Sequence, residues 1–173
     1  MMKAILRGSI FSLLLLGVAS DRRLEWLQGS VHSRETALEV AVPDKATVVR
    51  KQKTSLTGQL TAFNKASLTL SAAGYSETVP LNQVKSIEFQ GDVWIEGEPL
   101  PSRIRGQSKT LQELPTNAFR LGNSPQKATI SLKTMSPQGL ERLLKDTRNK
   151  SYGMDKILLI SSGKITITIR EIE

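Results

Sequence analysis

LTGQLTAFNKASLTL, residues 56–70, contains two strand-like runs that meet at Asn64 and Lys65. Apolar or small residues alternate with threonine or glutamine along the first run, and leucine alternates with threonine along the second. This period of two predicts strands with one buried and one solvent-facing side. Asn64 tolerates the left-handed conformation and therefore suits a reversal. Gly58 inside the first strand indicates a bend or a close backbone approach.

The pattern resembles the first signature of the Sm-like fold. In that signature a glycine lies between two apolar residues, separated from each by one residue of any type. Two further residues, an apolar residue and an aspartate then follow, and a second strand begins. Asn64 stands where that family usually has Asp, and Ser67 stands where nucleotide-binding members usually carry Asn. Residues 79–89 resemble the last two strands of the bacterial RNA-chaperone branch, but Leu81 and Asn82 occupy the place of its Tyr-Lys-His RNA pocket. The resemblance covers roughly residues 46–90. It implies an Sm-like barrel without that pocket.

Composition limits the chemistry of the chain. It has 173 residues, 39% of them apolar and 5% aromatic, so aliphatic side chains must fill the core. No cysteine is present, which excludes thiol nucleophiles, disulfides and cysteine-ligated metal sites. The formal charge of +8 is spread along the chain, as suits solubility and weak attraction to anionic surfaces.

Residues 1–20 have the layout of a secretory signal peptide. Lys3 and Arg7 precede a short apolar stretch, and small residues follow it, so we expect cleavage near Ser20 and a secreted or periplasmic mature chain without a transmembrane span. The apolar stretch is about half of the ~20 residues that a membrane-spanning helix needs. Retention as an uncleaved anchor is the alternative, and Arg22 and Arg23 favour it.

A lead-in segment, residues 21–45, is predicted to contain a short helix from Asp21 to about Leu38. Leu24, Leu27 and Val31 share one helical face. In the Sm-like fold a helix precedes the barrel and covers one end. The one histidine, His32, has no acidic cluster beside it, so we interpret it as a surface or packing residue.

Five strands are expected within residues 46–90, with a tight turn at Ala73-Gly74. The resemblance implies that the open edges of the fourth and fifth strands pair between subunits into a ring. The expected strands cover residues 46–52, 54–63, 66–72, 75–81 and 84–89.

The rest of the chain divides into two parts. Residues 91–127 hold four prolines and four glycines, which break regular structure, together with too many apolar residues for a disordered linker. We expect an ordered, irregular excursion that packs on the barrel. Residues 128–173 read as a βαββ unit, with a helix starting at Ser136-Pro137 and a C-terminal hairpin. The fold class is therefore α+β and β-rich.

No motif for catalysis, phosphate binding or dinucleotide binding occurs, so we expect no enzyme activity, no metal and no cofactor. The fold-signature positions are Gly58 and Asn64. A basic surface is the other candidate site, and strong nucleic-acid binders add aromatic stacking platforms that are scarce here. Its residues are Arg103, Arg105, Lys109, Arg148 and Lys150.

The sequence is compatible with two functional hypotheses. The preferred one is an exported, non-enzymatic module of the bacterial cell envelope that acts through strand edges, by self-association or by docking onto a protein partner. The alternative is an Sm-like nucleic-acid-binding protein with a diffuse basic surface, which requires that residues 1–20 not direct export. The mature N-terminus separates the two.

Overall fold

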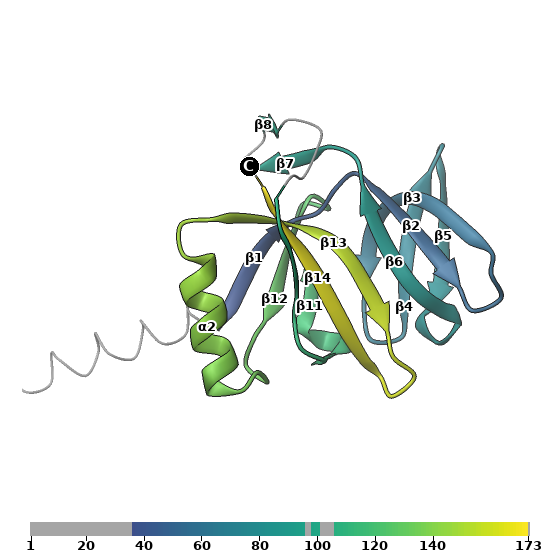
Figure 1. Cartoon of the computed structure of the whole chain (residues 1–173). Helices are drawn as coiled ribbons and strands as arrows, with labels where there is room; N and C mark the ends of the chain where they lie inside the picture. Colours follow the sequence, from purple (N-terminus) through teal and green to yellow (C-terminus); the bar gives the residue numbers. More distant parts are fainter. Residues whose placement is uncertain (1–35, 96–97, 101–105, 173) are drawn as a thin grey trace, which may run out of the picture. The chain divides into compact units, whose positions relative to one another are not determined.

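The computed structural model describes residues 36–95, 98–100 and 106–172, a part of the chain in which strands predominate and a single α-helix occurs (Figure 1). The strands are β1 (Ala37–Ala41), β2 (Lys45–Arg50), β3 (Ser55–Phe63), β4 (Ser67–Ala72), β5 (Tyr75–Pro80), β6 (Val84–Gln90), β7 (Val93–Ile95), β8 (Glu98–Leu100), β9 (Ser108–Thr110), β10 (Leu114–Pro115), β11 (Phe119–Leu121), β12 (Lys127–Ser131), β13 (Ser151–Leu159) and β14 (Lys164–Ile172). The helices are α2 (Pro137–Thr147) and the 3-10 turns η1 (Leu81–Gln83) and η2 (Thr116–Ala118).

Strands β2 to β6 confirm the five-strand prediction. They pair antiparallel in the spatial order β6-β2-β3-β4-β5. The leucines of the alternating pattern point into the core, and Leu60, Leu68 and Leu70 are at most 1% exposed. Period-two burial is therefore what fixes the faces of these strands.

Both predicted reversals are present. The side-chain oxygen of Asn64 accepts hydrogen bonds from the backbone N–H groups of Ala66 and Ser67, at 2.8 and 2.9 Å, and closes an Asx turn between β3 and β4. Ala73 and Gly74 have φ angles of 48° and 85° and join β4 to β5. Two successive positive φ angles are typical of the type I′ turn of a two-residue hairpin.

The sheet continues beyond β6 through strands from both ends of the described chain, in the order β11-β12-β1-β13-β6. Strand β13 changes partner along its length: Gly153 pairs parallel with Ala41 of β1, whereas Lys156 to Leu158 pair antiparallel with β6. A register shift at Asp155 separates the two halves. Strand β14 pairs with the other side of β13, and with β9 and β10. The result is one curled, mixed sheet.

Helix α2 begins as the sequence predicts. The Oγ of Ser136 accepts a hydrogen bond from the backbone N–H of Gly139 at 3.2 Å, and Pro137 occupies the first turn. Leu143 and Thr147 are buried, and Leu140 and Leu144 pack against the core. These four side chains form the inner face of the helix.

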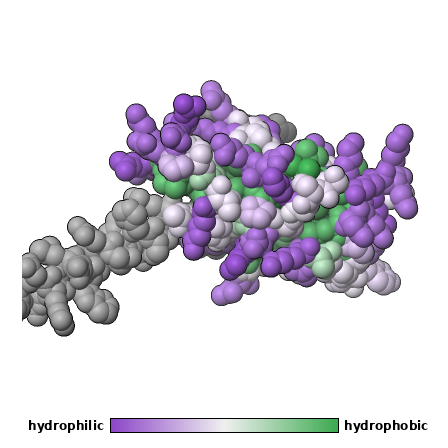
Figure 2. All heavy atoms as spheres, turned by 90° about the horizontal axis from the view of Figure 1, so that it is seen from below, coloured by the Kyte–Doolittle hydropathy of each residue, from purple (hydrophilic) through white to green (hydrophobic). Residues whose placement is uncertain are grey.

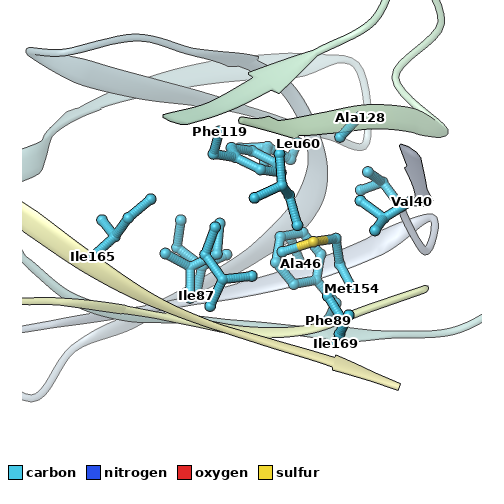
Figure 3. Packing of buried hydrophobic residues seen from close by; sticks show 14 of the residues in the cluster. Val40, Ala46, Leu60, Ile87, Phe89, Phe119, Ala128, Met154, Ile165 and Ile169 are labelled. Carbon is cyan, nitrogen blue, oxygen red and sulfur yellow. The ribbon is translucent and has the colours of Figure 1, made fainter. Parts of the chain in front are cut away.

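One aliphatic core joins the early and late strands. Side chains of β1, β3, β6, β13 and β14 point toward one another in Figure 3, among them Val40, Leu60, Ile87, Met154 and Ile165. The rings of Phe63 on β3 and Phe119 on β11 meet edge to face, with centroids 5.1 Å apart. Because β11 and β3 are far apart in the strand order, this contact shows how strongly the sheet curls.

The structure corrects the prediction for the lead-in segment. Leu38 lies in β1 and Lys45 begins β2, so the C-terminal part of residues 21–45 is extended. Residues 37–40 alternate in burial, and residues 37–41 pair with β12; this long-range pairing overrides local helical spacing. The rest of the expected helix, with His32, and the expected signal peptide lie outside the described residues.

The excursion at residues 91–127 is more regular than expected. It contains the β7–β8 hairpin, β9, β10, η2 and β11. The three last strands are two or three residues long, and β14 or β12 supplies their partners. Leu111, Leu114 and Phe119 are buried, as an ordered segment requires.

The fifth predicted strand does not have an open edge. Strand β6 pairs with β2 on one side and with β13 on the other. The expectation that its edge is free to pair between subunits is wrong, because the chain's own C-terminal hairpin occupies it. The resemblance covers only residues 46–90, and therefore carried no information on β13.

Candidate functional site: the open edge of β5

Strand β5 ends the long strand path of the sheet. Within the described part of the chain it pairs only with β4. All its residues are exposed except Val79, and Tyr75 is 81% exposed. An unpaired strand edge is a template for another strand. The edge of β5 is therefore the candidate binding site of this unit.

The register of β4 and β5 determines which backbone groups face outward. The N–H of Leu81 donates to the carbonyl of Ala66 at 2.8 Å, just past the Ser67–Pro80 pair. Hydrogen-bonded and non-hydrogen-bonded pairs alternate in antiparallel strands, so Thr69–Thr78 and Ser71–Ser76 are pairs of the second kind. The N–H and C=O groups of Ser76 and Thr78 consequently point to the open edge.

The edge has a defined length. At its N-terminal end Gly74 lies in the left-handed region and cannot continue a strand, and at its C-terminal end Pro80 has no N–H to donate. Only Ser76 and Thr78 offer both a donor and an acceptor. A partner strand is thereby limited to a short stretch with these two residues at its centre.

Two contacts hold β5 in place. Val79 is 1% exposed and anchors one face in the core. On the opposite face the Oγ1 atoms of Thr69 and Thr78 lie 3.0 Å apart, within hydrogen-bonding distance. The edge is thus positioned before a partner arrives, which lowers the entropic cost of binding.

Basic residues lie beside this edge. Arg50 at the end of β2 donates from Nη2 to Glu77 on β5, so β2 and β5 approach each other here. The backbone N–H of Lys51 donates to the carbonyl of Gln83 at 2.8 Å, which places the β2–β3 turn against η1. Lys51, Lys53 and Lys85 are exposed and form no ion pair in the described part of the chain.

The charge balance of this group is positive, since Glu77 is the one acid opposite four bases. The Nε of Arg50 is buried and has no hydrogen-bond partner among the described residues. One carboxylate therefore does not satisfy the donors of this guanidinium. Hydrophilic side chains stand out around the end of the unit that carries β2 to β5 (Figure 2).

The two fold-signature residues have structural roles. A Cβ atom at Gly58 would lie 2.6 Å from the carbonyl oxygen of Ser71, so β3 and β4 approach too closely there for a side chain. Asn64 closes the turn that leads into β4. Both residues set the course of β4, on which β5 depends, and neither contacts the open edge.

Two residues of the predicted basic surface are paired with acids. Lys109 pairs with Asp146 at 3.4 Å and lies over the ring of Tyr152, while Lys150 pairs with Glu171 at 2.8 Å. The hydrogen bond that Lys150 donates to the carboxylate of Glu171 raises the pKa of Lys150 above its ordinary value. Arg148 is exposed at the C-cap of α2, where positive charge is favoured. Arg103 and Arg105 lie outside the described residues.

The family resemblance predicted an open edge on the fourth strand, which is β5, but it did not identify the residues whose backbone is free. The residues of the edge, Ser76 and Thr78, carry no motif, and only the strand order shows that their backbone is unpaired. A second signal was the composition of this fourth predicted strand, whose polar residues and proline are typical of edge strands.

Other kinds of site find no support in the described residues. No group of three or more His, Cys, Asp or Glu side chains in this part of the chain is arranged to hold a metal ion. None of its helices has the length and apolarity needed to cross a membrane. Comparisons with protein-family models, with curated proteins and with solved structures found no match. The function must therefore be inferred from the strand edge and its surroundings.

Proposed function

We propose that this protein is an exported, non-enzymatic interaction module of the cell envelope, which docks onto a protein partner by adding the partner's strand to the edge of β5. The observation that carries the proposal is the unpaired backbone of Ser76 and Thr78 on a strand that the core already holds. Strand addition uses such main-chain groups for affinity. Export rests on residues 1–20, with cleavage near Ser20.

Docking onto a different protein is favoured over self-association. If two copies pair antiparallel through Ser76 and Thr78, Glu77 of one copy comes to lie opposite Glu77 of the other. Like charges directly opposite each other destabilise a strand pair. A shift that centres the pair on Thr78 instead places Ser76 opposite Pro80, which has no N–H. Both registers are unfavourable, as expected of an edge protected against its own copies.

The docking test removes the N–H of Thr78, which points to the open edge, and leaves the backbone hydrogen bonds between β4 and β5 intact. Thr78→Pro removes that N–H. Thr78→Val is the matched control, because both variants lose the hydroxyl that contacts Thr69 but only Thr78→Pro also loses the N–H. Tyr75, exposed beside the edge, is replaced by a photo-crosslinking phenylalanine derivative in cells that express the protein natively. We expect a defined adduct with Thr78→Val and its loss with Thr78→Pro.

Thermal melting of both variants shows whether they fold. An adduct that survives in a folded Thr78→Pro protein, or no adduct in either variant, would refute docking at β5. Export is tested separately by N-terminal sequencing and cell fractionation. A chain that starts near Asp21 outside the cytoplasm supports the proposal, whereas a full-length cytoplasmic chain contradicts it.

The second candidate is nucleic-acid binding by an Sm-like barrel formed by β2 to β6. The unpaired lysines beside η1 favour it, as does the close approach at Gly58 that the family signature implies. Tyr75 is strongly exposed, but the other aromatic rings whose exposure the structure describes are buried or half-buried, which leaves little stacking surface. These rings are Phe63, Phe89, Phe119 and Tyr152. A salt series with single-stranded RNA tests this candidate, because phosphate contacts give a steep loss of affinity with salt.

A further inference from the structure

We infer that the partner segment is acidic, with its carboxylates on the side that extends past Pro80. This inference rests on the proposed docking at β5 and specifies the chemistry of its partner. It follows from the position of four bases relative to the open edge, and from the absence of compensating acids among the described residues there.

The bases lie at one end of the edge. Lys51 is held against Gln83 by its backbone hydrogen bond, and Gln83 follows Pro80 by three residues. Lys85 lies two residues further along the chain, and Lys53 is in the same turn as Lys51. A strand added to β5 runs about 4.8 Å from it. Its residues beyond Pro80 therefore pass this basic turn.

The bases beside β5 have one carboxylate partner, Glu77, among the described residues. Five further ion pairs join a lysine or arginine to a carboxylate at 2.8–3.4 Å. Beside β5, Glu77 is already engaged by Arg50, and Lys51, Lys53 and Lys85 form no ion pair in the described part of the chain. Exposed bases elsewhere, such as Lys133 and Lys145, form none there either, so what distinguishes these three lysines is their position beside the open edge. A carboxylate supplied by a partner provides the missing opposite charge. Complementary charge of this kind steers encounter and fixes register.

Glu77 is not an obstacle to an acidic partner. Its carboxylate is paired with Arg50, and the alternation of the ladder directs its backbone groups toward β4. It does disfavour an acid directly opposite, in the centre of the paired stretch. We therefore expect neutral β-forming residues in the centre of the partner segment and acids at its end.

The test measures the affinity of two synthetic fluorescent peptides for the full mature chain. Both contain a central stretch of alternating valine and threonine; one carries three glutamates at each end, and the other carries glutamines there. Acids at both ends allow for either strand direction. We expect the acidic peptide to bind about three- to tenfold more tightly at low salt, and the preference to shrink at high salt, as for exposed ion pairs.

Matched variants locate the effect. Lys51→Gln/Lys85→Gln should remove the preference for the acidic peptide. Lys133→Gln/Lys145→Gln removes the same charge from exposed positions just before and within α2, at the opposite end of the unit from β5, and should retain it (Figure 1). Thr78→Pro should abolish binding of both peptides, whereas Thr78→Val should not.

The outcomes bear on two claims, docking at β5 and the preference for an acidic partner. If the two peptides bind equally well and Thr78→Pro abolishes their binding, docking at β5 stands and the acidic preference is overturned. Acidic-peptide binding that persists in Thr78→Pro shows charge attraction without strand addition and overturns both claims. Binding of neither peptide overturns both as well. Tighter binding of an RNA oligomer, unaffected by Thr78→Pro but lost with Lys51→Gln/Lys85→Gln, would assign the basic turn to nucleic acid instead.

Discussion

Replacing Gly58 by alanine tests whether a close backbone approach shapes the sheet beneath the docking edge. An alanine Cβ would lie 2.6 Å from the carbonyl oxygen of Ser71, 3.1 Å from its carbonyl carbon and 3.2 Å from the Cβ of Ala72. Contacts under 3.0 Å essentially never occur for real Cβ atoms. The two nearest atoms belong to the backbone of β4 and cannot rotate away. Strand β4 must therefore move, with β5 behind it.

Two opposing effects set the magnitude. Forcing an extra methyl group into a packed site typically costs about 1–3 kcal/mol. Alanine in a strand regains roughly 0.5–1 kcal/mol of backbone entropy relative to glycine. Because backbone rather than a side chain must yield, we place the overpacking cost at the upper end, and expect a net loss of about 2 kcal/mol. For a unit of this size that corresponds to a fall in Tm of roughly 5–10 °C.

Urea unfolding followed by circular dichroism measures the loss. Gly163→Ala is the control, since a Cβ there meets nothing within 4 Å but the φ of +77° is unfavourable for alanine. That variant should lose only about 1 kcal/mol, through backbone strain. The reasoning is refuted if Gly58→Ala unfolds within about 0.5 kcal/mol of the wild type, or is more stable than Gly163→Ala.

Three further predictions concern local contacts. Asn64→Ala should lower the free energy of unfolding by about 1–2 kcal/mol in urea titrations, because it removes the acceptor of two backbone N–H groups; Asn64→Asp keeps that acceptor and should come close to the wild type. Ser136→Ala should cost about 1 kcal/mol by removing the N-cap of α2, and Ser136→Asp should restore it, as thermal melting would show. The hydrogen bond from Lys150 to Glu171 raises the pKa of the lysine in the folded state. The stability that this bond contributes is therefore fully present below pH 10.5 and is lost as the pH rises through the folded-state pKa. Melting curves of Glu171→Gln should lack this additional loss of stability at alkaline pH.

Local signals in the sequence predicted the local structure well. The alternation around Leu60 and Leu70 placed β3 and β4, Asn64 and Ala73-Gly74 marked the turns, and Ser136-Pro137 marked the start of α2. Each of these features depends on interactions between residues that are close in the sequence, either burial of one strand face or a hydrogen bond to the adjacent backbone. A short stretch of sequence is therefore enough to predict them.

Long-range pairing could not be predicted in the same way. Strand β1 resembled the end of a helix because its few residues become a strand only when β12 pairs with them, about 90 residues later in the chain. The two strand edges expected to be open illustrate the limit. The edge of the fourth predicted strand, β5, is open as the resemblance implied, but the edge of the fifth, β6, is covered by β13, which lies about 70 residues later in the chain.

The change of partner along β13 decides which edge stays open. At Asp155 the strand leaves β1, and from Lys156 onward it pairs with β6. The carboxylate of Asp155 accepts hydrogen bonds from Arg170 Nη2 at 3.2 Å and from Ser108 Oγ at 3.3 Å, which ties the irregular residue to β14 and β9. Because β13 thus fills the edge of β6 within the same chain, the five strands β2 to β6 retain one free edge instead of two. Building a ring requires two free edges per subunit, whereas docking a single strand requires one, and β5 supplies it.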